Sequence, residues 1–370
     1  MQVFKHKEFA GHEQVVFCND DQTGLRAIVA IHDTTLGPAL GGCRMWDYPS
    51  EEEALADVLR LSRGMTYKAA VTGLSLGGGK AVIFGDPART KSPALFHAFG
   101  RFVESLGGRY ITAEDVNISV ADMELVREET RYVSGLGTGS GDPSPLTALG
   151  VYSGIRAAVQ HRLKQDSLQG LTIAVQGCGK VGSHLCRLLH EDGAALVIAD
   201  MDAARAGAMA TETGARVVDS AGIHREAVDV FAPCALGGGL NDTTIPEIRA
   251  GIIAGAANNQ LLNEAIHAAQ LVERGILYAP DYVINAGGLI NVYLELRGYN
   301  LRLAEEKARQ IARSLEAIFQ VAEKDGITTV AASNRIAEDR LQQARKPSTH
   351  LKNSMDAQDW LDDEHRKKSG

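Results

Sequence analysis

Apolar residues in the first part of the chain repeat with two different periods. The run RAIVAIHD (26–33) is mostly apolar and predicts a buried strand. Between 51 and 68 the apolar residues fall instead at helical spacing, at Leu55, Val58, Leu59 and Met65. Ser50 and Glu53 have the spacing of a capping box, which predicts that this helix begins directly after Ser50.

Two more short runs in the same region, AVIFG (81–85) and RYITAED (109–115), predict further strands. The stretch SGLGTGSGDPSP (134–145) then interrupts the pattern, because glycine, serine and proline dominate it and it has no apolar period. Such a composition is typical of a linker or hinge. Residues 1–135 are therefore expected to form one α/β domain.

Strands and helices alternate regularly after this break. The predicted strands are LTIAVQ (171–176), ALVIAD (195–200), VDVFAPC (228–234), GIIAGAAN (251–258) and ILYAP (276–280). The predicted helices cover 146–162, 181–193, 203–213 and, as one long amphipathic segment, about 303–324. This alternation implies a doubly wound parallel sheet in a second domain at 136–329. The charged segment from about 330 to 370 predicts a helix to about Arg345 that returns to the first domain, followed by a loose tail.

Composition narrows the class of protein. The 370 residues are 45% hydrophobic, which is enough for two cores. The net charge of −8 argues against a nucleic-acid partner, because phosphate binding needs clustered Lys and Arg. No apolar run is long enough to span a membrane, and the N-terminus lacks the apolar region of a secretion signal. The five cysteines form no CxxC pair, so we expect a cytoplasmic protein with reduced thiols and no metal site.

Three glycines stand directly before Lys80 in the segment GLSLGGGKAVI (73–83). A phosphate-binding loop would need a glycine at the position of Leu74 and a hydroxyl residue at that of Ala81, so this motif is excluded. Two interpretations remain open. The segment is either a tight turn with a solvated lysine, or a slim backbone at Gly77–Gly79 that lets a small substrate approach Lys80.

A complete GxGxxG pattern lies between a predicted strand and a predicted helix, at Gly177, Cys178, Gly179, Lys180, Val181 and Gly182. In this context the first glycine makes the turn, the second admits a pyrophosphate, and the third lets helix and strand pack closely. Asp200 ends the next strand, where a carboxylate binds a ribose diol and repels a 2′-phosphate. The pattern therefore favours NAD over NADP, in a Rossmann-type domain. A turn of this shape that binds no cofactor remains the alternative. Asp202 is a second candidate for binding the ribose, but its position suits the N-cap of the next helix.

Two further charged residues are candidates for chemistry. Asp115, in TAEDVN, ends the predicted strand 109–115. Lys68 lies three residues after Met65 and so shares its helix face. A cation beside an apolar side chain suits a substrate that is partly apolar and carries a carboxylate. The alternative is a lysine that compensates the C-terminal dipole of its helix.

Six segments, in order along the chain, carry a resemblance to a known family: IHDTTLGPALGG (31–42), RLSRGMTYKAA (60–70), LGGGKAVI (76–83), GRYITAEDVN (108–117), GDPSPLTALGVY (141–152) and APDYVINAGGLINV (279–292). Over about residues 1–345 the chain resembles the amino-acid dehydrogenases that act on Glu, Leu, Phe and Val, and is most similar to the leucine enzymes. The resemblance implies a reversible oxidative deamination of an L-amino acid with NAD, giving a 2-oxo acid and ammonia. It also implies a homo-oligomer, an octamer or a dimer.

The resemblance implies roles for individual residues as well. Lys80 would be the catalytic lysine that deprotonates water, Asp115 its partner in proton transfer, and Lys68 the ligand of the substrate carboxylate. Asn258 and Ala235 would contact the cofactor, and Asn285 the polar end of the substrate. A cleft between the substrate domain and the Rossmann domain would close about the hinge at 134–145.

The substrate pocket implied by the resemblance is apolar. Its members would be Leu40, Gly41, Gly42, Met65, Ala113, Leu289 and Val292. A glutamate-specific enzyme would need a cation there, so a branched-chain amino acid, leucine first, is expected. Asn117-Ile118 and Tyr293 are instead more similar to members that act on aromatic amino acids, which keeps phenylalanine and tryptophan open. A non-catalytic sensor that binds NAD is the alternative from another class.

Overall fold

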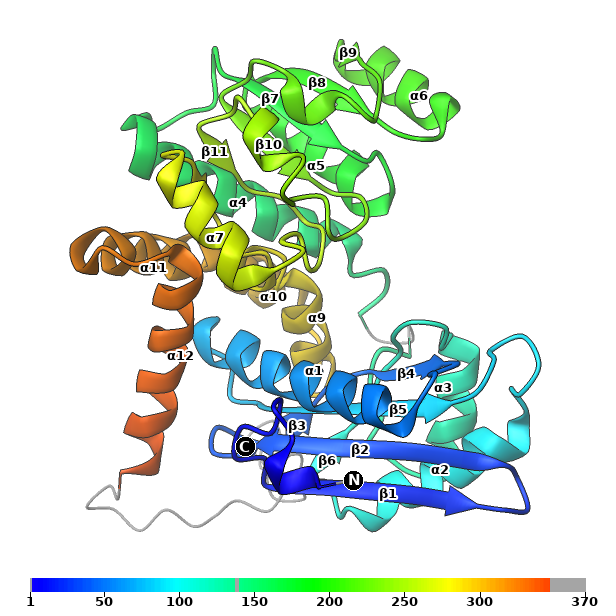
Figure 1. Cartoon of the computed structure of the whole chain (residues 1–370). Helices are drawn as coiled ribbons and strands as arrows, with labels where there is room; N and C mark the ends of the chain where they lie inside the picture. Colours follow the sequence, from blue (N-terminus) through cyan, green and yellow to red (C-terminus); the bar gives the residue numbers. More distant parts are fainter. Residues whose placement is uncertain (1, 137–139, 347–370) are drawn as a thin grey trace, which may run out of the picture. The chain divides into compact units, whose positions relative to one another are not determined.

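The computed structural model describes residues 2–136 and 140–346, which fall into two compact units (Figure 1). The first unit is built from residues 1–141, 292–299 and 337–370, and the second from 142–291 and 300–336. Each unit contains its own six-stranded sheet. The expected combination of an α/β domain with a Rossmann-type domain is confirmed.

The division of the chain differs from the predicted domains, 1–135 with 330–370 and 136–329, at three short stretches. Residues 136–141 and 292–299 belong to the first unit, and 330–336 to the second. Glu295 ties its segment to the first unit, because its carboxylate accepts hydrogen bonds from Gly135 N at 3.1 Å and Ser140 Oγ at 2.5 Å. Within the predicted linker, residues 137–139 lie outside the described residues.

A mixed sheet forms the core of the first unit. Its strands follow the order β1-β2-β5-β3-β6, and β4 pairs with β5. Antiparallel pairing joins β1 to β2 and β2 to β5, whereas β3, β4 and β6 add parallel pairs. The strands are β1 (Gln14–Asp20), β2 (Leu25–Asp33), β3 (Ala39–Leu40), β4 (Cys43–Trp46), β5 (Gly77–Phe84) and β6 (Tyr110–Ile111). The strand predicted at 109–115 is therefore mostly irregular, and Asp115 does not end it.

Helix α1 (Glu51–Val71) packs against β2 and β5 of this sheet (Figure 1). Ser50 Oγ accepts a hydrogen bond from Glu53 N at 3.2 Å, which confirms the predicted start of the helix. Leu55, Val58 and Leu59 are fully buried on its inner face. The remaining helices of the unit's N-terminal part are η1 (Val3–Lys5), α2 (Pro93–Ser105) and α3 (Val120–Arg127).

Six parallel strands form the sheet of the second unit, in the order β12-β11-β10-β7-β8-β9. This is the doubly wound order of a dinucleotide-binding fold. The strands are β7 (Thr172–Gln176), β8 (Ala195–Ala199), β9 (Arg216–Val217), β10 (Val230–Pro233), β11 (Ile252–Ile253) and β12 (Leu277–Tyr278). The predicted parallel sheet is confirmed, although several strands are shorter than the apolar runs suggest.

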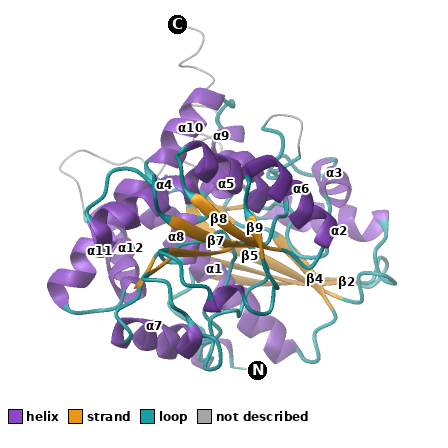
Figure 2. Ribbon diagram, turned by 90° about the horizontal axis from the view of Figure 1, so that it is seen from above, coloured by secondary structure: helices purple, strands orange, loops and turns teal. Residues whose placement is uncertain are grey.

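Helices flank this sheet; α5 lies against β7 and β8, and α6 lies against β8 and β9 (Figure 2). The helices of the second unit are α4 (Ser144–Leu163), α5 (Lys180–Glu191), α6 (Ala203–Thr213), η2 (Ile223–Arg225), η3 (Ile245–Glu247), α7 (Glu264–Glu273), α8 (Asp281–Ile284), α10 (Leu301–Arg309) and α11 (Ile311–Asp325). Two more, α9 (Gly287–Glu295) and α12 (Thr329–Arg345), begin in the second unit and end in the first. No helix in the described part of the chain has both the length and the hydropathy needed to cross a membrane.

The single long helix predicted at 303–324 is wrong, because the chain forms α10 and α11 with a turn at Gln310. The buried residues of the two helices are Ala304, Ala308, Ile311, Leu315, Ile318, Phe319 and Ala322. Their helical spacing continues across the turn, so the apolar period alone does not reveal it.

Candidate active site

Lys80 lies inside β5 and is only 5% exposed. Its Nζ is 2.8 Å from Oδ2 of Asp115, which comes from the loop after β6. The interpretation of Lys80 as a solvated turn residue is therefore wrong. A buried lysine needs a paired anion, and the structure brings together the two residues that the sequence predicts as the catalytic pair.

The glycines before Lys80 belong to the strand itself and admit protein atoms. A methyl group on Gly78 would lie 2.1 Å from Thr66 N of α1, and one on Gly77 would lie 2.1 Å from Asp33 O. A methyl group on Gly79 would lie 2.6 Å from the ring of Tyr110. These glycines thus let α1 and the neighbouring segments approach β5 closely, and the predicted role of clearing space for a substrate is corrected to close packing.

The loop that carries Asp115 is held by β4. Cys43 N donates to Ala113 O at 2.7 Å, and Met45 N donates to Val116 O at 3.1 Å. Asn117 adopts a left-handed φ of 61° and donates from Nδ2 to Met45 O at 3.0 Å. Asparagine tolerates this conformation better than most residues. The conformation of this turn therefore explains the asparagine at position 117, where the chain resembles members that act on aromatic amino acids.

Arg44, in β4, is a second cation on Asp115 that sequence reasoning missed. Its Nε donates to the same oxygen, Oδ2, at 3.1 Å. Burial alone would raise the pKa of Asp115, but the charge and hydrogen bond of Lys80 and the charge of Arg44 outweigh it and hold this pKa below its ordinary value. Asp115 is thus a carboxylate that favours its ionised form.

Lys68 is half-buried in the last turns of α1. The end of this helix is fixed by Arg340 of α12, whose Nη1 donates to Ala70 O at 2.6 Å and to Ala69 O at 3.3 Å. Tyr67 donates to Glu338 Oε1 at 2.7 Å. Because Arg340 already compensates the C-terminal carbonyls of α1, Lys68 is not required for that purpose.

The residues predicted to line the substrate pocket differ in burial. Leu40 is 2% exposed and Leu289 is 8% exposed, whereas Met65, Ala113 and Val292 are half-buried. Leu289 and Val292 lie three residues apart on α9 and share one face.

Gly41 and Gly42 make close contacts within the first unit. A methyl group on Gly41 would lie 1.7 Å from Gly79 O and 3.4 Å from Met65 Cγ, and one on Gly42 would lie 2.8 Å from Asp115 Cβ. The segment after Leu40 is therefore directly beside the Lys80–Asp115 pair.

The GxGxxG turn of the second unit has the geometry of a dinucleotide site. Gly177 has a φ of 101°, and a methyl group on Gly182 would lie 1.9 Å from Gly177 O. Gly179 has open space around it, as a phosphate-binding position requires. It is the N-cap of α5, and no side chain caps this helix terminus. Backbone N–H groups of α5 are thus suited to bind a pyrophosphate.

Asp200 lies beside this turn, as predicted. Its Oδ2 accepts a hydrogen bond from Cys178 N at 2.7 Å, and its Oδ1 accepts one from Asp202 N at 2.8 Å. A carboxylate has about four acceptor positions, so acceptors remain for a ribose diol. Asp202 caps α6 through Ala204 N and Arg205 N, which confirms the prediction that it is an N-cap.

Other predicted cofactor residues gather at the carboxyl ends of the parallel strands. A methyl group on Gly177 would lie 3.2 Å from Ala235 Cβ, so the end of β10 adjoins the glycine turn. Asn285 Nδ2 donates to Asn258 Oδ1 at 2.6 Å and to Ala256 O at 3.1 Å. Ligands of such sheets bind at this edge, and the residues present therefore fit a dinucleotide.

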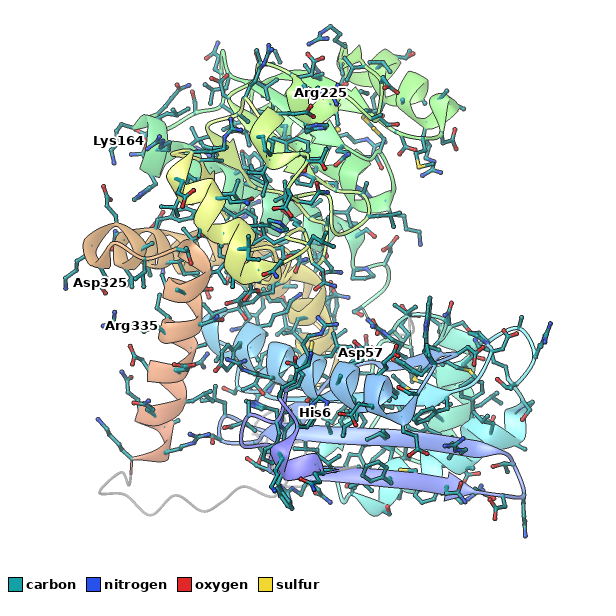
Figure 3. The ribbon with its side chains drawn as sticks, viewed as in Figure 1. His6, Asp57, Lys164, Arg225, Asp325 and Arg335 are labelled. Carbon is teal, nitrogen blue, oxygen red and sulfur yellow. The ribbon has the colours of Figure 1, made fainter. Side chains whose placement is uncertain are left out.

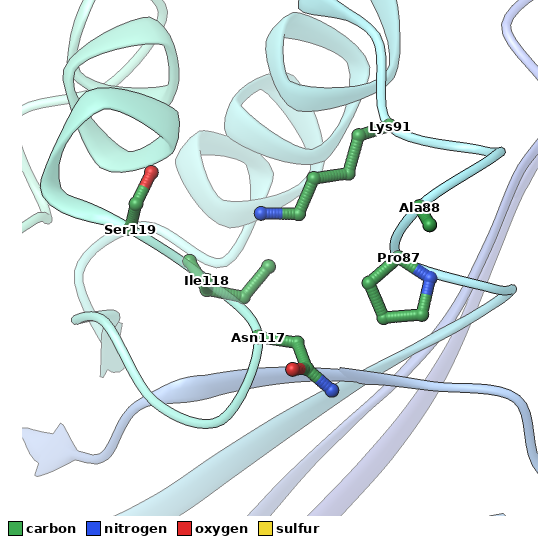
Figure 4. Close-up of a pocket in the computed structure, with 6 residues that line it drawn as sticks. All are labelled: Pro87, Ala88, Lys91, Asn117, Ile118 and Ser119. Carbon is green, nitrogen blue, oxygen red and sulfur yellow. The ribbon is translucent and has the colours of Figure 1, made fainter.

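Two cavities lie away from these residues. An open depression of about 480 Å³ is lined by Pro87, Ala88, Lys91, Asn117, Ile118 and Ser119 (Figure 4). Its lysine is already paired, with Nζ at 2.5 Å from Asp122 Oδ2. A cavity of about 330 Å³ lies in the second unit and includes His161 and Phe319. Neither contains a predicted site residue. Among the described residues, no group of His, Cys, Asp or Glu side chains is arranged to hold a metal ion.

Comparison with known proteins matches both parts of the chain. Residues 12–132 match the model of the Glu/Leu/Phe/Val dehydrogenase dimerisation domain, and residues 138–219 and 198–348 match the Glutamate/Leucine/Phenylalanine/Valine dehydrogenase model. A leucine dehydrogenase from Geobacillus stearothermophilus is 54% identical over 94% of this chain and 95% of its own. A valine dehydrogenase from Streptomyces virginiae is 50% identical over 92% and 96%.

The fold is also similar to a solved relative. The crystal structure of L-tryptophan dehydrogenase from Nostoc punctiforme superposes with a TM-score of 0.85 at 50% identity, covering 91% of this chain and 97% of that one. Fold, paired site residues and sequence identity agree over nearly the whole chain. The protein therefore belongs to the glutamate/leucine/phenylalanine/valine dehydrogenase family and is an amino-acid dehydrogenase that acts on the CH–NH₂ group.

Proposed function

We propose that the protein catalyses the reversible, NAD-dependent oxidative deamination of an apolar L-amino acid, with leucine or another branched-chain amino acid as the main substrate. In the forward direction the amino acid, NAD⁺ and water give a 2-oxo acid, ammonium, NADH and a proton. The observation that carries this proposal is the buried Lys80–Asp115 pair, 2.8 Å apart, in a chain of this family.

The residues of the first unit would manage the protons of this reaction. The bound nicotinamide supplies the hydride acceptor, and loss of hydride from Cα leaves an iminium group on the substrate. Lys68 would bind the α-carboxylate, and Lys80 Nζ would take a proton from the water that attacks the iminium carbon. Asp115 would accept this proton from Lys80 Nζ, 2.8 Å away, and donate it to the departing amine. Burial of Lys80 supports this role, because excluding bulk water prevents the loss of the transferred proton to solvent.

An apolar substrate is supported by the residues expected to touch its side chain: Leu40, Met65, Ala113, Leu289 and Val292. Gly41 and Gly42 are proposed beside the substrate backbone, and Asn285 at its polar end. An aromatic substrate is the second candidate, because the L-tryptophan dehydrogenase is 50% identical to this chain. One methylene in such a pocket is worth only about 1–3 kcal/mol, so pocket volume decides between these substrates.

The second unit would bind the cofactor through Gly177–Gly182, Asp200, Ala235 and Asn258. Members of this family are generally NAD(P)-dependent. We propose NAD, because the Asp200 carboxylate beside the glycine turn would bind the ribose diol and repel a 2′-phosphate.

A homo-oligomer in the cytoplasm is also proposed. Among the described strands none pairs with the outer edge of β1, and Phe17 on this strand is 54% exposed. An unpaired strand edge with an exposed aromatic residue suits contact with a second copy. The five cysteines are free thiols, as is usual in a reducing compartment. Light scattering of the purified protein would measure the subunit number.

The test is NADH formation, followed by absorbance, with a panel of twenty L-amino acids and with NAD or NADP. We expect turnover with Leu, Ile, Val, Phe or Trp, and a loss of about 10²–10⁴-fold in kcat for Lys80→Ala and for Asp115→Asn. Lys91→Ala is the matched control, because this lysine is also paired with an aspartate but lies outside the site. If no amino acid reduces either nucleotide, the proposed function is refuted.

A further inference from the structure

Oxygen Oδ2 of Asp115 receives two cations from two strands. Lys80 Nζ approaches it from β5 at 2.8 Å, and Arg44 Nε approaches it from β4 at 3.1 Å. Both of these approaches are to Oδ2, and the backbone N–H of Val116 also donates to this carboxylate. The proposed reaction uses only one of these two groups, Lys80, to transfer protons, so the presence of Arg44 requires its own explanation.

Arg44 is itself held by a second carboxylate. Its Nη1 donates to Asp57 Oδ2 at 2.9 Å, and the Tyr48 hydroxyl donates to the same oxygen at 2.8 Å. The side chains of Arg44 and Asp57 are 20% and 15% exposed. Asp57 lies on α1, the helix that also carries Lys68 (Figure 3). A guanidinium group thus bridges a carboxylate of α1 and the carboxylate of the proposed proton carrier.

We propose that Arg44, anchored by Asp57, is a positioning residue of the active site that fixes Oδ2 of Asp115 and leaves Oδ1 to exchange the proton with the substrate amine. This inference rests on the proposed function, because it assigns Asp115 to proton transfer. Arginine suits the task, since its planar fork carries donors that reach two carboxylates in fixed directions. A lysine would supply the charge but not the two directed bonds.

Arg44 also sets the charge at this carboxylate. The titratable groups near Asp115 are Lys80 from β5 and Arg44 from β4, with Asp57 of α1 behind it. The Cys43 thiol and the Tyr110 hydroxyl are also near, and burial keeps both neutral by raising their pKa. Arg44 is one of the groups that lower the pKa of Asp115. Removing its charge therefore raises this pKa towards the ordinary value of an aspartate.

The test compares Arg44→Lys, Arg44→Gln and Asp57→Asn with the wild-type chain under the conditions in which it turns over. We expect kcat to fall about 10- to 100-fold in both Arg44 variants, because small displacements of a catalytic group cost this much. The KM for the amino acid should change less than threefold, since Lys68 binds the carboxylate. Asp57→Asn, which keeps Arg44 but weakens its anchor, should lower kcat by a smaller factor.

The pH dependence separates charge from position. In Arg44→Gln the acidic limb of the kcat profile should move to higher pH, whereas Arg44→Lys should keep the wild-type limb at a lower rate. A purely structural role would lower the melting temperature and leave this limb in place. Arg26→Gln is the matched control, because Arg26 makes an exposed ion pair of 2.7 Å with Glu51 of α1, the helix that also carries Asp57. The kcat and pH profile of this variant should equal those of the wild-type chain.

Three outcomes decide the matter. If the wild-type chain turns over and both Arg44 variants keep its kcat and pH profile, the positioning role is refuted while the proposed function stands. If Arg44→Gln does not fold, as circular dichroism would show, Arg44→Lys and Asp57→Asn decide in the same way. If the wild-type chain itself reduces no nucleotide with any amino acid, the proposed function is refuted and the role of Arg44 with it.

Discussion

Replacing Gly78 by alanine should destabilise the first unit and separate α1 from β5. The added methyl group would lie 2.1 Å from Thr66 N, 2.2 Å from Thr66 Oγ1 and 2.5 Å from Ser62 O. To restore a contact of about 3.5 Å, helix and strand must move apart by about 1.4 Å. This movement would also disturb the hydrogen bond of 2.8 Å between Thr66 Oγ1 and Nδ1 of His32.

The magnitude follows from three terms. Overpacking of a tight core costs about 1–3 kcal/mol, and the disturbed hydrogen bond costs about 1 kcal/mol. The lower entropy of the unfolded alanine chain returns about 0.5–1 kcal/mol. The net loss in the free energy of unfolding is therefore about 1–3.5 kcal/mol, or roughly 2–4 °C in Tm for each kcal/mol.

Gly64→Ala is the matched control, since Gly64 is an exposed residue of α1 with nothing within 4 Å of an added methyl group. Alanine should stabilise the helix there by about 0.5–1 kcal/mol. Thermal and urea unfolding would measure both variants, with turnover as a second readout. If Gly78→Ala keeps wild-type stability and loses only activity, its glycine serves the substrate and the packing explanation is refuted.

Three further changes test other parts of the structure. Burial and the nearby His12 lower the pKa of His32 from 6.5 to about 4, so the unfolded chain takes up this proton at higher pH than the folded protein. This contribution to stability is thus fully present above about pH 7.5 and falls by about 2 kcal/mol between pH 7.5 and 5 in urea titrations. His32→Gln should remove most of this loss, and His12, whose pKa burial also lowers, should retain part of it. Asp200→Ala should lower kcat/KM for NAD more than for NADP, since it removes a carboxylate proposed to bind the ribose diol; an unchanged ratio would remove Asp200 from the ribose site. Arg340→Gln should raise the KM for the amino acid and lower Tm with little change in kcat, because Arg340 holds the end of α1 near Lys68; a fall in kcat alone would contradict this.

The central strands of the second unit were predicted because β7, β8, β10 and β11 are largely buried and read as apolar runs, whereas the exposed β9 was not predicted. The helix at 203–213 has the predicted bounds, and the GxGxxG turn and Asp200 lie together as expected. In the first unit, by contrast, β1 was not predicted. Only Cys18 of this strand is buried, so QVVFCND carries no strong alternation. A half-exposed edge strand has few buried apolar residues, so its sequence shows only a weak hydrophobic pattern.

The glycines of β5 and the side chain of Arg44 show two other features that the sequence alone could not predict. Glycine is disfavoured in strands in general, so three in a row predict a turn. They lie in a strand because α1 approaches closely at Gly78, the Asp33 backbone at Gly77 and the Tyr110 ring at Gly79. Arg44 and Asp115 are 71 positions apart. Hydrophobic periodicity is local and cannot predict a contact between residues so far apart in the chain. The family motifs identify Lys80 and Asp115, but they do not show which side chains surround this pair.

The first unit combines an early part of the chain with a late one, which has a consequence for synthesis. Its closing contacts come from α12, where Glu338 binds Tyr67 and Arg340 caps α1. A ribosome synthesises these residues after the whole second unit, whose folding can proceed without them. The nascent chain therefore exposes an incomplete first domain while the dinucleotide domain forms, and the helix that bears Lys68 gains its final support only after α12 has been synthesised.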